Sequence, residues 1–528
     1  MKLNYRRTIC VGFAFFLICA FWQAYDNIIA LTLTNKFGMP QAYSGIIMAF
    51  DNILALFMLP LFGALSDKCH SKLGKRTPFI IVGTIIAAVA FISLSFVDNM
   101  QLTNIADVTK IDSETSLETL YDFDYGKTTL KTTSGKEFRV SDFDRDTFLS
   151  IRTDTEWDTK GNDVTNNTEY TGERINPYSE YVSPARQAYA WRATLNNPTT
   201  LLFFISLLLV VLVAMSVFRS PAVALMPDVT PKPLRSKGNA VINLMGSAGG
   251  VLVLVLGMVF GTGSAKNGLM SYVVFFSVIA ALMITALIAF LLTVKENRFV
   301  QEMEKESHRL GIFETEGDGS NGNRKLSRSE IASLLLILAS VALWYIGYNA
   351  VSSKYSVYAT NILQKDYNMT LIIAQAAAIV SYLPVGMISS KFGRKKCILA
   401  GVAILSTAFG AAYFVNASTP GLLMNLLFAL AGIGWATINV NSFPMVVELA
   451  KGGNVGKYTG YYYTASMAAQ VITPYLSGLL MDRFGMTTLF PYATVFVAIA
   501  FITMLFVKHG DSLTTRKQSV LENFDIED

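Results

Sequence analysis

The sequence predicts an all-α membrane protein with twelve transmembrane helices in two parallel repeats of six. Three observations predict this fold class: an apolar composition, twelve apolar windows, and loop motifs that recur in the two halves of the chain. Of the 528 residues, 52% are hydrophobic and 15% are charged, and the mean hydropathy is positive. A soluble fold of this size needs more charge on its surface, so the expected solvent is a lipid bilayer.

Each apolar window holds about 20 residues, the length that a helix needs to cross the hydrocarbon core. The expected spans are 9–34, 42–65, 78–97, 199–219, 238–261, 270–294, 331–360, 369–389, 397–415, 420–445, 458–481 and 488–507. The start of the chain, MKLNYRR and an apolar run, resembles a secretory signal. Because the run is too long and lacks a clear small-residue cleavage site, we expect an uncleaved first span.

Basic residues predict the orientation. With the N-terminus in the cytoplasm, the tails and loops of that side hold 26 Lys and Arg, against 4 in the short loops opposite. This asymmetry follows the positive-inside rule and predicts a multi-pass protein of the plasma membrane with both termini cytoplasmic. The formal charge of +5 therefore gives no indication of a nucleic-acid partner.

Cysteine and histidine predict neither a disulfide nor a metal site. Cys10 and Cys19 lie in the first span, and Cys69 and Cys397 lie in loops expected to be cytoplasmic. The three histidines are too scattered to form a ligand cluster. We expect no metal and no cofactor.

One region interrupts the apolar pattern. Residues 98–198 carry 18 acidic and 11 basic side chains, and the topology places them outside. Their many aromatic residues favour a small folded cap, while their acidity is equally consistent with a flexible loop. The expected units are a first half of residues 1–97 and 199–295, the insertion 98–198, a cytoplasmic linker 296–330, a second half 331–508, and a tail 509–528.

Two loop motifs recur. GALSDKCHSKLGKR follows the second span and GMISSKFGRKK follows the eighth, with their Gly-basic-basic triplets 319 residues apart. ALMPDVTPKPLRSKG after the fourth span resembles MVVELAKGGNVGKYTG after the tenth, and their acidic residues lie 220 residues apart. The two separations differ by 99 residues, which is nearly the length of the insertion 98–198. The halves are therefore predicted to be parallel repeats.

These motifs place acidic and basic groups at the cytoplasmic ends of neighbouring helices. We expect them to pair across the mouth of a central cavity in one state and to separate in the other, as a cytoplasmic gate. The alternative is that the basic residues only determine topology. The predicted gate residues are Gly63, Asp67, Lys68, Gly74, Lys75, Arg76, Arg219, Asp228, Arg235, Gly393, Arg394, Lys395, Glu448 and Lys457.

Three stretches resemble the sucrose/proton symporter family, of the glycoside-pentoside-hexuronide type, within the major facilitator superfamily. They are FGMPQAYSGIIMAFDN, GALSDKCHSKLGKRTPF and RSPAVALMPD. The residues that match the family pattern are Ser66, Asp67, Lys68, Cys69, Gly74, Pro78 and Phe79, whereas Lys75 and Thr77 replace arginines. The resemblance is specific over the first five spans and generic beyond them. The insertion has no counterpart in the plant pattern.

The resemblance implies a major facilitator fold and secondary active transport of a small sugar, usually a disaccharide, driven by protons. Carboxylates within spans usually mark a pathway or a proton site, and Asp26 and Asp51 are the candidates for proton coupling. Trp22 and Gln23 lie one helical turn before Asp26, so the three form a predicted sugar-binding face, with Asn52 a further contact. Alternatively, Asp26 only bonds neighbouring polar groups.

The second half offers similar faces. The expected sugar contacts there are Trp344, Tyr348, Asn349, Trp435, Asn439 and Asn441, although aromatics at this spacing also serve packing. The fourth span holds no carboxylate, unlike the plant relatives. Arg219 is assigned to the gate with Asp228, and Lys354 is expected to snorkel toward the outer interface.

Other functional classes are less well supported. An enzyme would need a nucleophile with a base or a metal cluster, and no histidine lies in an expected span. A solute sensor would need a signalling domain, and the cytoplasmic segments are too short to hold one. A uniporter or an exporter of another small organic solute remains the alternative within the carrier class. The expected partners are a small sugar, protons and the bilayer, with the protein a monomer.

Overall fold

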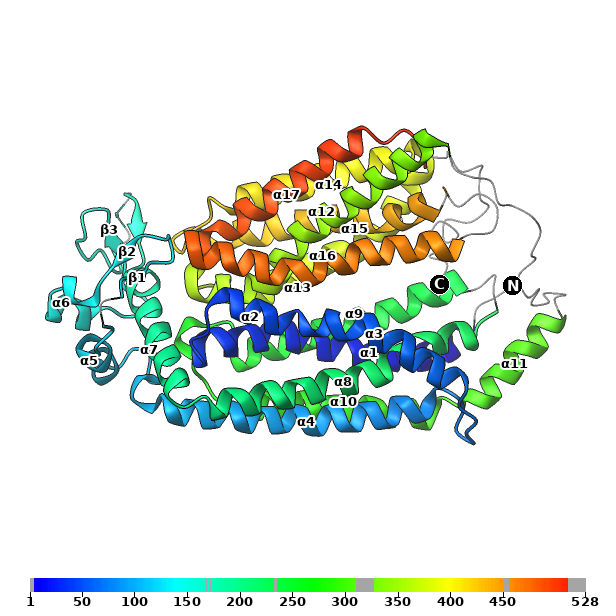
Figure 1. Ribbon diagram of the computed structural model, residues 1–528, viewed down its shortest axis with the longest axis horizontal. Coiled ribbons are helices and arrows are strands. Elements are labelled where there is room, and N and C mark those ends of the chain that lie inside the picture. Colours follow the sequence, from blue (N-terminus) through cyan, green and yellow to red (C-terminus); the bar gives the residue numbers. More distant parts are fainter. Residues whose placement is uncertain are drawn as a thin grey trace.

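The computed structural model describes residues 4–126, 128–167, 169–170, 172–231, 235–309, 327–447, 449 and 455–510. Two groups of long helices lie one above the other in Figure 1, with a small mixed unit at one end and α11, with the start of α1, at the opposite end. We name these the cap end and the terminal end. Residues 105–198, the mixed unit, are named the cap.

The N-terminal half contains six membrane-length segments. The first is α1 (Tyr5–Ala24), continued by the π-helical turns η1 (Tyr25–Ile29) and η2 (Thr32–Lys36), and the second is α2 (Gln41–Met48) with α3 (Phe50–Asp67). The others are α4 (Thr77–Asn104), α8 (Thr199–Asp228), α9 (Arg235–Phe260) and α10 (Val273–Thr293). The helix α11 (Glu296–Arg309) follows them at the terminal end.

The C-terminal half repeats this plan. Its segments are α12 (Arg328–Tyr358) with η8 (Ala359–Leu363), α13 (Tyr367–Phe392), α14 (Arg394–Ala412), α15 (Gly421–Val447), α16 (Val455–Phe484), and η9 (Met486–Thr488) with α17 (Leu489–Leu505). Within the described part of the chain, ten segments are long and apolar enough to cross a membrane, and α13 contains a shorter apolar helix. With the more polar α16, these segments make up the predicted twelve-helix fold.

The same helix pairings occur in both halves. In the first half α1 packs on α9 and α10, and α8 packs on α3 and α4. In the second half α12 packs on α16 and α17, and α15 packs on α13 and α14. The halves meet where α2 packs on α16 and α9 packs on α13, which are again equivalent pairs. Parallel six-helix repeats give this correspondence.

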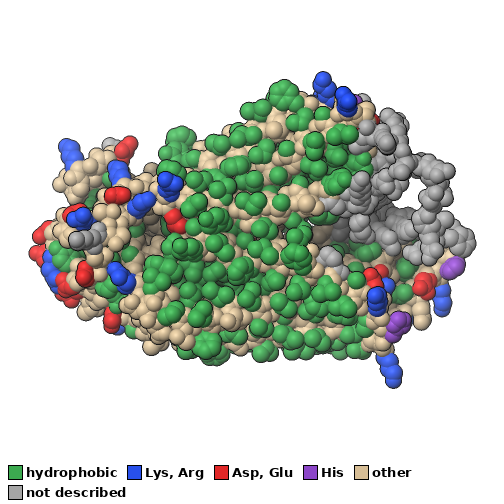
Figure 2. Space-filling model, in the orientation of Figure 1, with side chains coloured by type: hydrophobic (Ala, Val, Ile, Leu, Met, Phe, Trp, Pro, Cys, Tyr) green, Lys and Arg blue, Asp and Glu red, His purple; other side chains and the backbone are tan. Residues whose placement is uncertain are grey.

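The outward faces of the helices are apolar. Figure 2 shows a broad band of hydrophobic side chains between charged groups gathered at the two ends. Phe57, Leu292 and Val380, for example, are 67–73% exposed, which water would disfavour and lipid permits. The band is the surface expected to contact the bilayer.

The cap folds around an apolar cluster of its own. It contains α5 (Glu114–Asp122), α6 (Arg145–Ser150), α7 (Ser183–Asn196), and two hairpins, β1 (Leu130–Lys131) with β2 (Glu137–Phe138) and β3 (Trp157–Asp158) with β4 (Arg174–Ile175). Leu117, Leu120 and Phe148 are fully buried in the cluster. Burial of this kind gives the segment a defined structure instead of a flexible loop.

The helix of the third span extends seven residues beyond residue 97, where its apolar window was expected to end. The helix α4 continues to Asn104 because its polar residues find partners. Asp98 pairs with Lys36 at 2.6 Å, and Gln101 donates to Thr194 of α7 at 2.9 Å. An apolar window cannot detect such a helical extension.

Candidate functional site

Asp26 lies where α1 changes to the π-helical turn η1. Such turns are rare and occur often at functional sites, because the wider turn displaces side chains from the regular helical face. The Asp26 side chain is exposed, although its neighbours Tyr25 and Asn27 are buried. Trp22 and Gln23, one turn earlier, are half-buried. The structure thus brings the three predicted residues of this face together.

Asp51 of α3 and Arg219 of α8 complete a charged group with Asp26. All three are close enough to interact electrostatically, and the Asp51 carboxylate accepts a hydrogen bond from the Asn52 amide at 2.7 Å. The Arg219 guanidinium lies 5.4 Å from the centre of the Trp22 ring. We name Asp26, Asp51 and Arg219 the charge cluster.

The position of Arg219 corrects its assignment to the gate with Asp228. The two residues are nine positions apart on α8, which is roughly 13 Å along a helix. Arg219 therefore reaches inward to Trp22 and the two carboxylates, while Asp228 lies at the helix end. The sequence shows the spacing, but it does not show which helix Arg219 faces.

Aromatic residues of α12 and α15, in the second half, form the other side of the site. The rings of Tyr348 and Trp435 stack with centroids 3.7 Å apart and planes at 8°, and Tyr345 meets Trp435 edge-on at 5.2 Å. The helix α12, which carries Tyr348, packs against η1, which carries Asp26 of the other half, so the stacked pair and the charge cluster lie near each other. We name the charge cluster, Trp22, Gln23, Tyr348 and Trp435 the central site.

Two predicted contacts lie elsewhere in this conformation. Trp344 is 0% exposed and belongs to the main apolar core, so its ring cannot meet a solute. Asn441 is 1% exposed and donates to the Thr437 carbonyl one turn earlier on its own helix. Asn349 and Asn439 are half-buried, with Asn439 beside the Tyr382 hydroxyl.

The chemistry of the central site suits a hydroxylated solute. Carboxylates, an amide and an indole N–H bond hydroxyl groups, and flat aromatic faces cover the apolar C–H faces of a ring. The indole Nε1 of Trp22 is buried without a hydrogen-bond partner among the described residues. The two carboxylates can also take up a proton. The site therefore offers both binding groups and a proton acceptor.

The predicted gate residues of the first half converge on Arg76. Its guanidinium bonds Asp67 at 2.5 Å and Asp228 at 2.8 Å, and Lys75 lies 3.4 Å from Asp228. Arg76 also donates to Ser66 and to the Gly63 carbonyl. These contacts join α3, α4 and α8 within one half. Lys68 is exposed on the same loop.

Glu296 lies among the predicted gate residues, although its sequence context does not indicate this position. The residue is 1% exposed, and its carboxylate accepts from the backbone N–H of Arg76 and Thr77 and from the Thr77 hydroxyl at 2.7–3.2 Å. It thereby caps the start of α4, where helix N–H groups lack partners. Gly74 has φ +117°, and a Cβ there would lie 2.2 Å from the Glu296 carboxyl carbon. Only glycine fits at this position.

The equivalent residues of the second half are partly described. Gly393 ends α13 with φ +91°, Arg394 donates to the Pro444 carbonyl at 3.2 Å, and Lys395 donates to the Leu505 and Val507 carbonyls. Glu448 and the side chains of Arg235 and Lys457 lie outside the described residues. Pairing between the halves at this end therefore stays a prediction.

Contacts between the halves are found toward the cap end. The amide of Gln375 donates to Gln23 at 2.5 Å, and nearer the cap Asn361 donates to Asn35 at 2.9 Å. The Asp482 carboxylate accepts from the backbone N–H of Gln41 and Ala42 at 2.7–2.8 Å, so α16 of one half caps α2 of the other.

Lys354 reinforces this closure, which corrects the expectation that it snorkels. It is 0% exposed, and its ammonium donates to the Gln41 carbonyl at 2.9 Å and to the Ser44 hydroxyl at 2.8 Å. Close backbone contact adds to these bonds, since a Cβ on Gly45 would lie 2.0 Å from the Pro474 carbonyl oxygen. The halves are in tight contact at the cap end.

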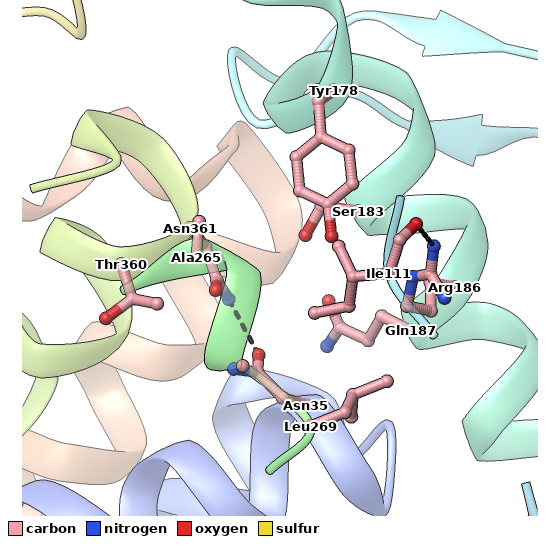
Figure 3. A pocket seen from close by; sticks show the side chains of 11 residues that line it. Asn35, Ile111, Tyr178, Ser183, Arg186, Gln187, Ala265, Leu269, Thr360 and Asn361 are labelled. Carbon is pink, nitrogen blue, oxygen red and sulfur yellow. Dashed lines mark hydrogen bonds between the residues drawn. The ribbon is translucent and has the colours of Figure 1, made fainter. Parts of the chain in front are cut away.

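A small polar pocket lies where the two halves and the cap meet. Figure 3 shows Asn35 and Asn361 bonded on one side and Tyr178, Gln187 and Arg186 of the cap on the other. The pocket offers about 20 Å³ to the centre of a water molecule. This volume admits water and excludes a sugar.

Comparisons with known proteins agree with this architecture. The family model described as MFS/sugar transport protein matches residues 10–109, and the Major Facilitator Superfamily model matches residues 366–523. The xylose transporter XylE from E. coli in an inward-open conformation has a TM-score of 0.54 over 98% of each chain, at 14% identity. A POT family transporter in complex with 5-aminolevulinic acid has a TM-score of 0.57 over 94% of each chain, at 10% identity. At these identities the likeness shows the fold alone.

Models of the major facilitator superfamily thus match one stretch in each half of the chain, and the solved structures share its twelve-helix fold. A local stretch is also similar to plant sucrose carriers: the sucrose transport protein SUC3 of Arabidopsis thaliana is 41% identical over 59 residues, and SUT3 of Oryza sativa subsp. indica is 39% identical over 59 residues. These matches cover 11% of this chain and about a tenth of the length of the curated relatives, 10% and 12% respectively.

Proposed function

We propose that this protein carries a small sugar, a disaccharide or a related glycoside, across the plasma membrane by alternating access in symport with protons. The observation that carries the proposal is the central site, in which Asp26 of one half lies near the stacked Tyr348 and Trp435 pair of the other. Each half contributes part of the site, so a rocking motion between the halves would expose a bound solute to one side at a time.

The orientation belongs to the same proposal. The basic loops and tails favour a cytoplasmic terminal end, which places the cap outside the cell. The close contacts at the cap end favour a state that is shut toward the outside. The units of the proposal are the two six-helix halves, the cap as an insertion in the first half, and the segment after α10 as their cytoplasmic linker.

Proton coupling is attributed to the charge cluster. With both carboxylates ionised, one guanidinium leaves a net negative charge, and uptake of one proton makes the cluster neutral. A neutral group is easier to bury than a charged one, so protonation favours the closed, loaded form in which the carrier turns over. Sugar and proton would then stabilise the same state, which is the requirement for symport.

Transport into proteoliposomes tests the proposed function. We expect labelled sucrose or maltose to accumulate when the cap side is acid, and to equilibrate without accumulation when the gradient is collapsed. Xylose and a nucleoside serve as comparison solutes. Sugar equilibration that does not depend on the proton gradient would favour a uniporter. Transport of an unrelated solute without transport of any sugar would refute sugar transport.

A further inference from the structure

The cap belongs to the first half by connectivity but also bonds the second half. Between α4 and α8 it is fixed to its own half, because the Thr194 hydroxyl donates to the Phe37 carbonyl at 2.9 Å and Gln187 donates to the Met39 carbonyl at 3.1 Å. Leu269, in the connection from α9 to α10, is part of the apolar cluster of the cap. The cap must therefore move with the first half.

The hairpin β1–β2 lies against the end of α16. The Lys131 ammonium donates to the Arg483 carbonyl at 2.9 Å and to the Asp482 carbonyl at 3.3 Å. At the turn, the Thr133 carbonyl accepts from the Thr487 N–H at 3.4 Å. Carbonyl groups at the end of a helix attract a cation, so Lys131 is well placed to hold α16.

Two glycines allow the hairpin to approach this closely. Gly135 has φ +89°, and a Cβ there would lie 2.3 Å from the Phe484 carbonyl oxygen. Gly485 has φ +98°, and a Cβ there would lie 2.6 Å from the Gly135 nitrogen. The backbones of the cap and the second half are thus in direct contact, and any larger residue would separate them.

A second contact uses side-chain amides. Asn176 and Gln364 bond each other reciprocally at 2.9 and 3.0 Å, and Gln364 also donates to Ser179 at 3.2 Å. Gln364 has φ +50°, a left-handed conformation that is unfavourable for a residue other than glycine. The strained backbone persists where its surroundings hold it, here at the point where η8 meets the cap.

The hairpin is also held firmly inside the cap. The Glu180 carboxylate accepts from the Thr133 hydroxyl at 2.6 Å and from the Ser134 hydroxyl at 2.9 Å. A pull on the turn is therefore transmitted to the body of the cap instead of bending a free loop. We name as the strap the β1–β2 hairpin, Glu180 and Asn176, together with the groups of the second half that the hairpin and Asn176 bond.

We propose that the strap regulates transport by holding the cap ends of the two halves together, so that the cap sets the balance between the cap-end-closed and cap-end-open states. Opening at the cap end must separate the halves, and the cap travels with the first. Every strap contact must then break, whereas contacts within the cap and within each half can persist. Loss of the strap should favour the open state.

This inference rests on the proposed alternating access but not on the identity of the solute, so its test needs no substrate. Thr360 is 1% exposed in the pocket of Figure 3, and its hydroxyl has no partner among the described residues. A Thr360→Cys thiol therefore replaces no hydrogen bond and becomes reactive only when the cap end opens. The reporter is introduced after the four native cysteines are replaced by alanine.

The key variant is Gly135→Ala, with Gly161→Ala as the matched control. Gly161 lies in the same cap with φ +86°, but a Cβ there meets nothing within 4 Å. Both changes impose the same backbone strain, and only one separates the strap from α16. In purified protein, we expect maleimide to label Thr360→Cys about tenfold faster with Gly135→Ala and at the parent rate with Gly161→Ala.

A second pair of variants, Lys131→Ala and its control Lys136→Ala, tests the strap if Gly135→Ala fails to fold. Lys131→Ala removes the bonds to α16, and Lys136→Ala removes an exposed lysine of the same hairpin. Faster labelling with Lys131→Ala alone supports the strap. Equal labelling in the two lysine variants, or in the two glycine variants, would overturn it. Loss of sugar transport with unchanged strap-dependent labelling would count against the proposed function alone.

Discussion

The Arg219 guanidinium lies 5.4 Å from the centre of the Trp22 ring, between a predicted sugar contact and two carboxylates. A cation over an indole face is stabilised by about 0.5–2 kcal/mol, the upper part of the range applying away from water. The arrangement fixes the Trp22 ring and balances part of the charge of Asp26 and Asp51. A change at Arg219 should therefore affect binding and coupling together.

Arg219→Gln should reduce transport by more than tenfold, because it leaves two carboxylates within the membrane without their cation. Asp51→Asn in the same chain removes one of these charges and should restore part of the activity. The measurement is initial uptake by the two single variants and the double variant at equal protein levels. Strictly additive losses would show that the residues act independently.

The stacked pair of Tyr348 and Trp435 is predicted to bind the sugar. Trp435→Ala should weaken sugar binding by roughly three- to tenfold, the value of an aromatic contact of about 0.5–1.5 kcal/mol. The matched control is Trp344→Phe, which changes a tryptophan in the core and should leave affinity unaltered. Binding is measured by calorimetry or by competition. Equal weakening in both variants would argue against a stacking contact.

At the terminal end, Arg76 is 5% exposed and Asp67 is 60% exposed. Because solvent screens an exposed carboxylate, the ion pair of Asp67 contributes only about 0–1 kcal/mol to folding stability. Asp67→Asn should therefore leave insertion and sugar binding largely intact, and it should slow transport because it removes a predicted gate contact. Arg76→Gln also breaks the bond to Asp228 and should lower thermal stability distinctly more. Lys72→Gln, at an exposed lysine of the same loop that is not a predicted gate residue, is the control. An unchanged turnover rate for a well-expressed Asp67→Asn protein would refute the gating role.

Lys36 and Asp98 form an ion pair that is 0% and 1% exposed, with their atoms 2.6 Å apart. Removing one partner leaves an uncompensated buried charge, so Lys36→Met alone should destabilise the folded protein by about 3–5 kcal/mol. Lys36→Met with Asp98→Leu should recover much of this loss. Thermal unfolding in detergent compares the variants. A double variant no more stable than Lys36→Met would indicate that packing, and not charge, is the larger effect.

Apolar windows predicted the twelve helices well, because a bilayer requires long apolar segments and satisfied backbones. The orientation that the basic loops indicate stays a prediction. The site was predicted less completely. Asp26, Trp22 and Gln23 share a face by helical spacing alone, and the structure brings them together. Trp344 lies one helical turn before Tyr348 and was predicted to share its face, yet Trp344 is buried in the core. Helical spacing alone does not reveal which side of a helix is packed.

Long-range partners account for the remaining differences. Lys354 is buried by bonds to Gln41 and Ser44, more than 300 positions away, and Glu296 caps a helix 219 positions earlier. Nothing local in the sequence marks either contact. The loop motif around Asp67 did predict a charged cluster, but the described ion pairs lie within one half.

The central claim, that Asp26 couples sugar movement to protons, is tested most directly with Asp26→Asn in proteoliposomes. The amide imitates the protonated carboxyl and cannot release a proton. We expect the variant to exchange labelled sugar down its gradient at a rate near that of the parent, and to lose all accumulation driven by an acid cap side. Accumulation of sugar against its gradient by Asp26→Asn would contradict the claim and assign the coupling role to Asp51 instead.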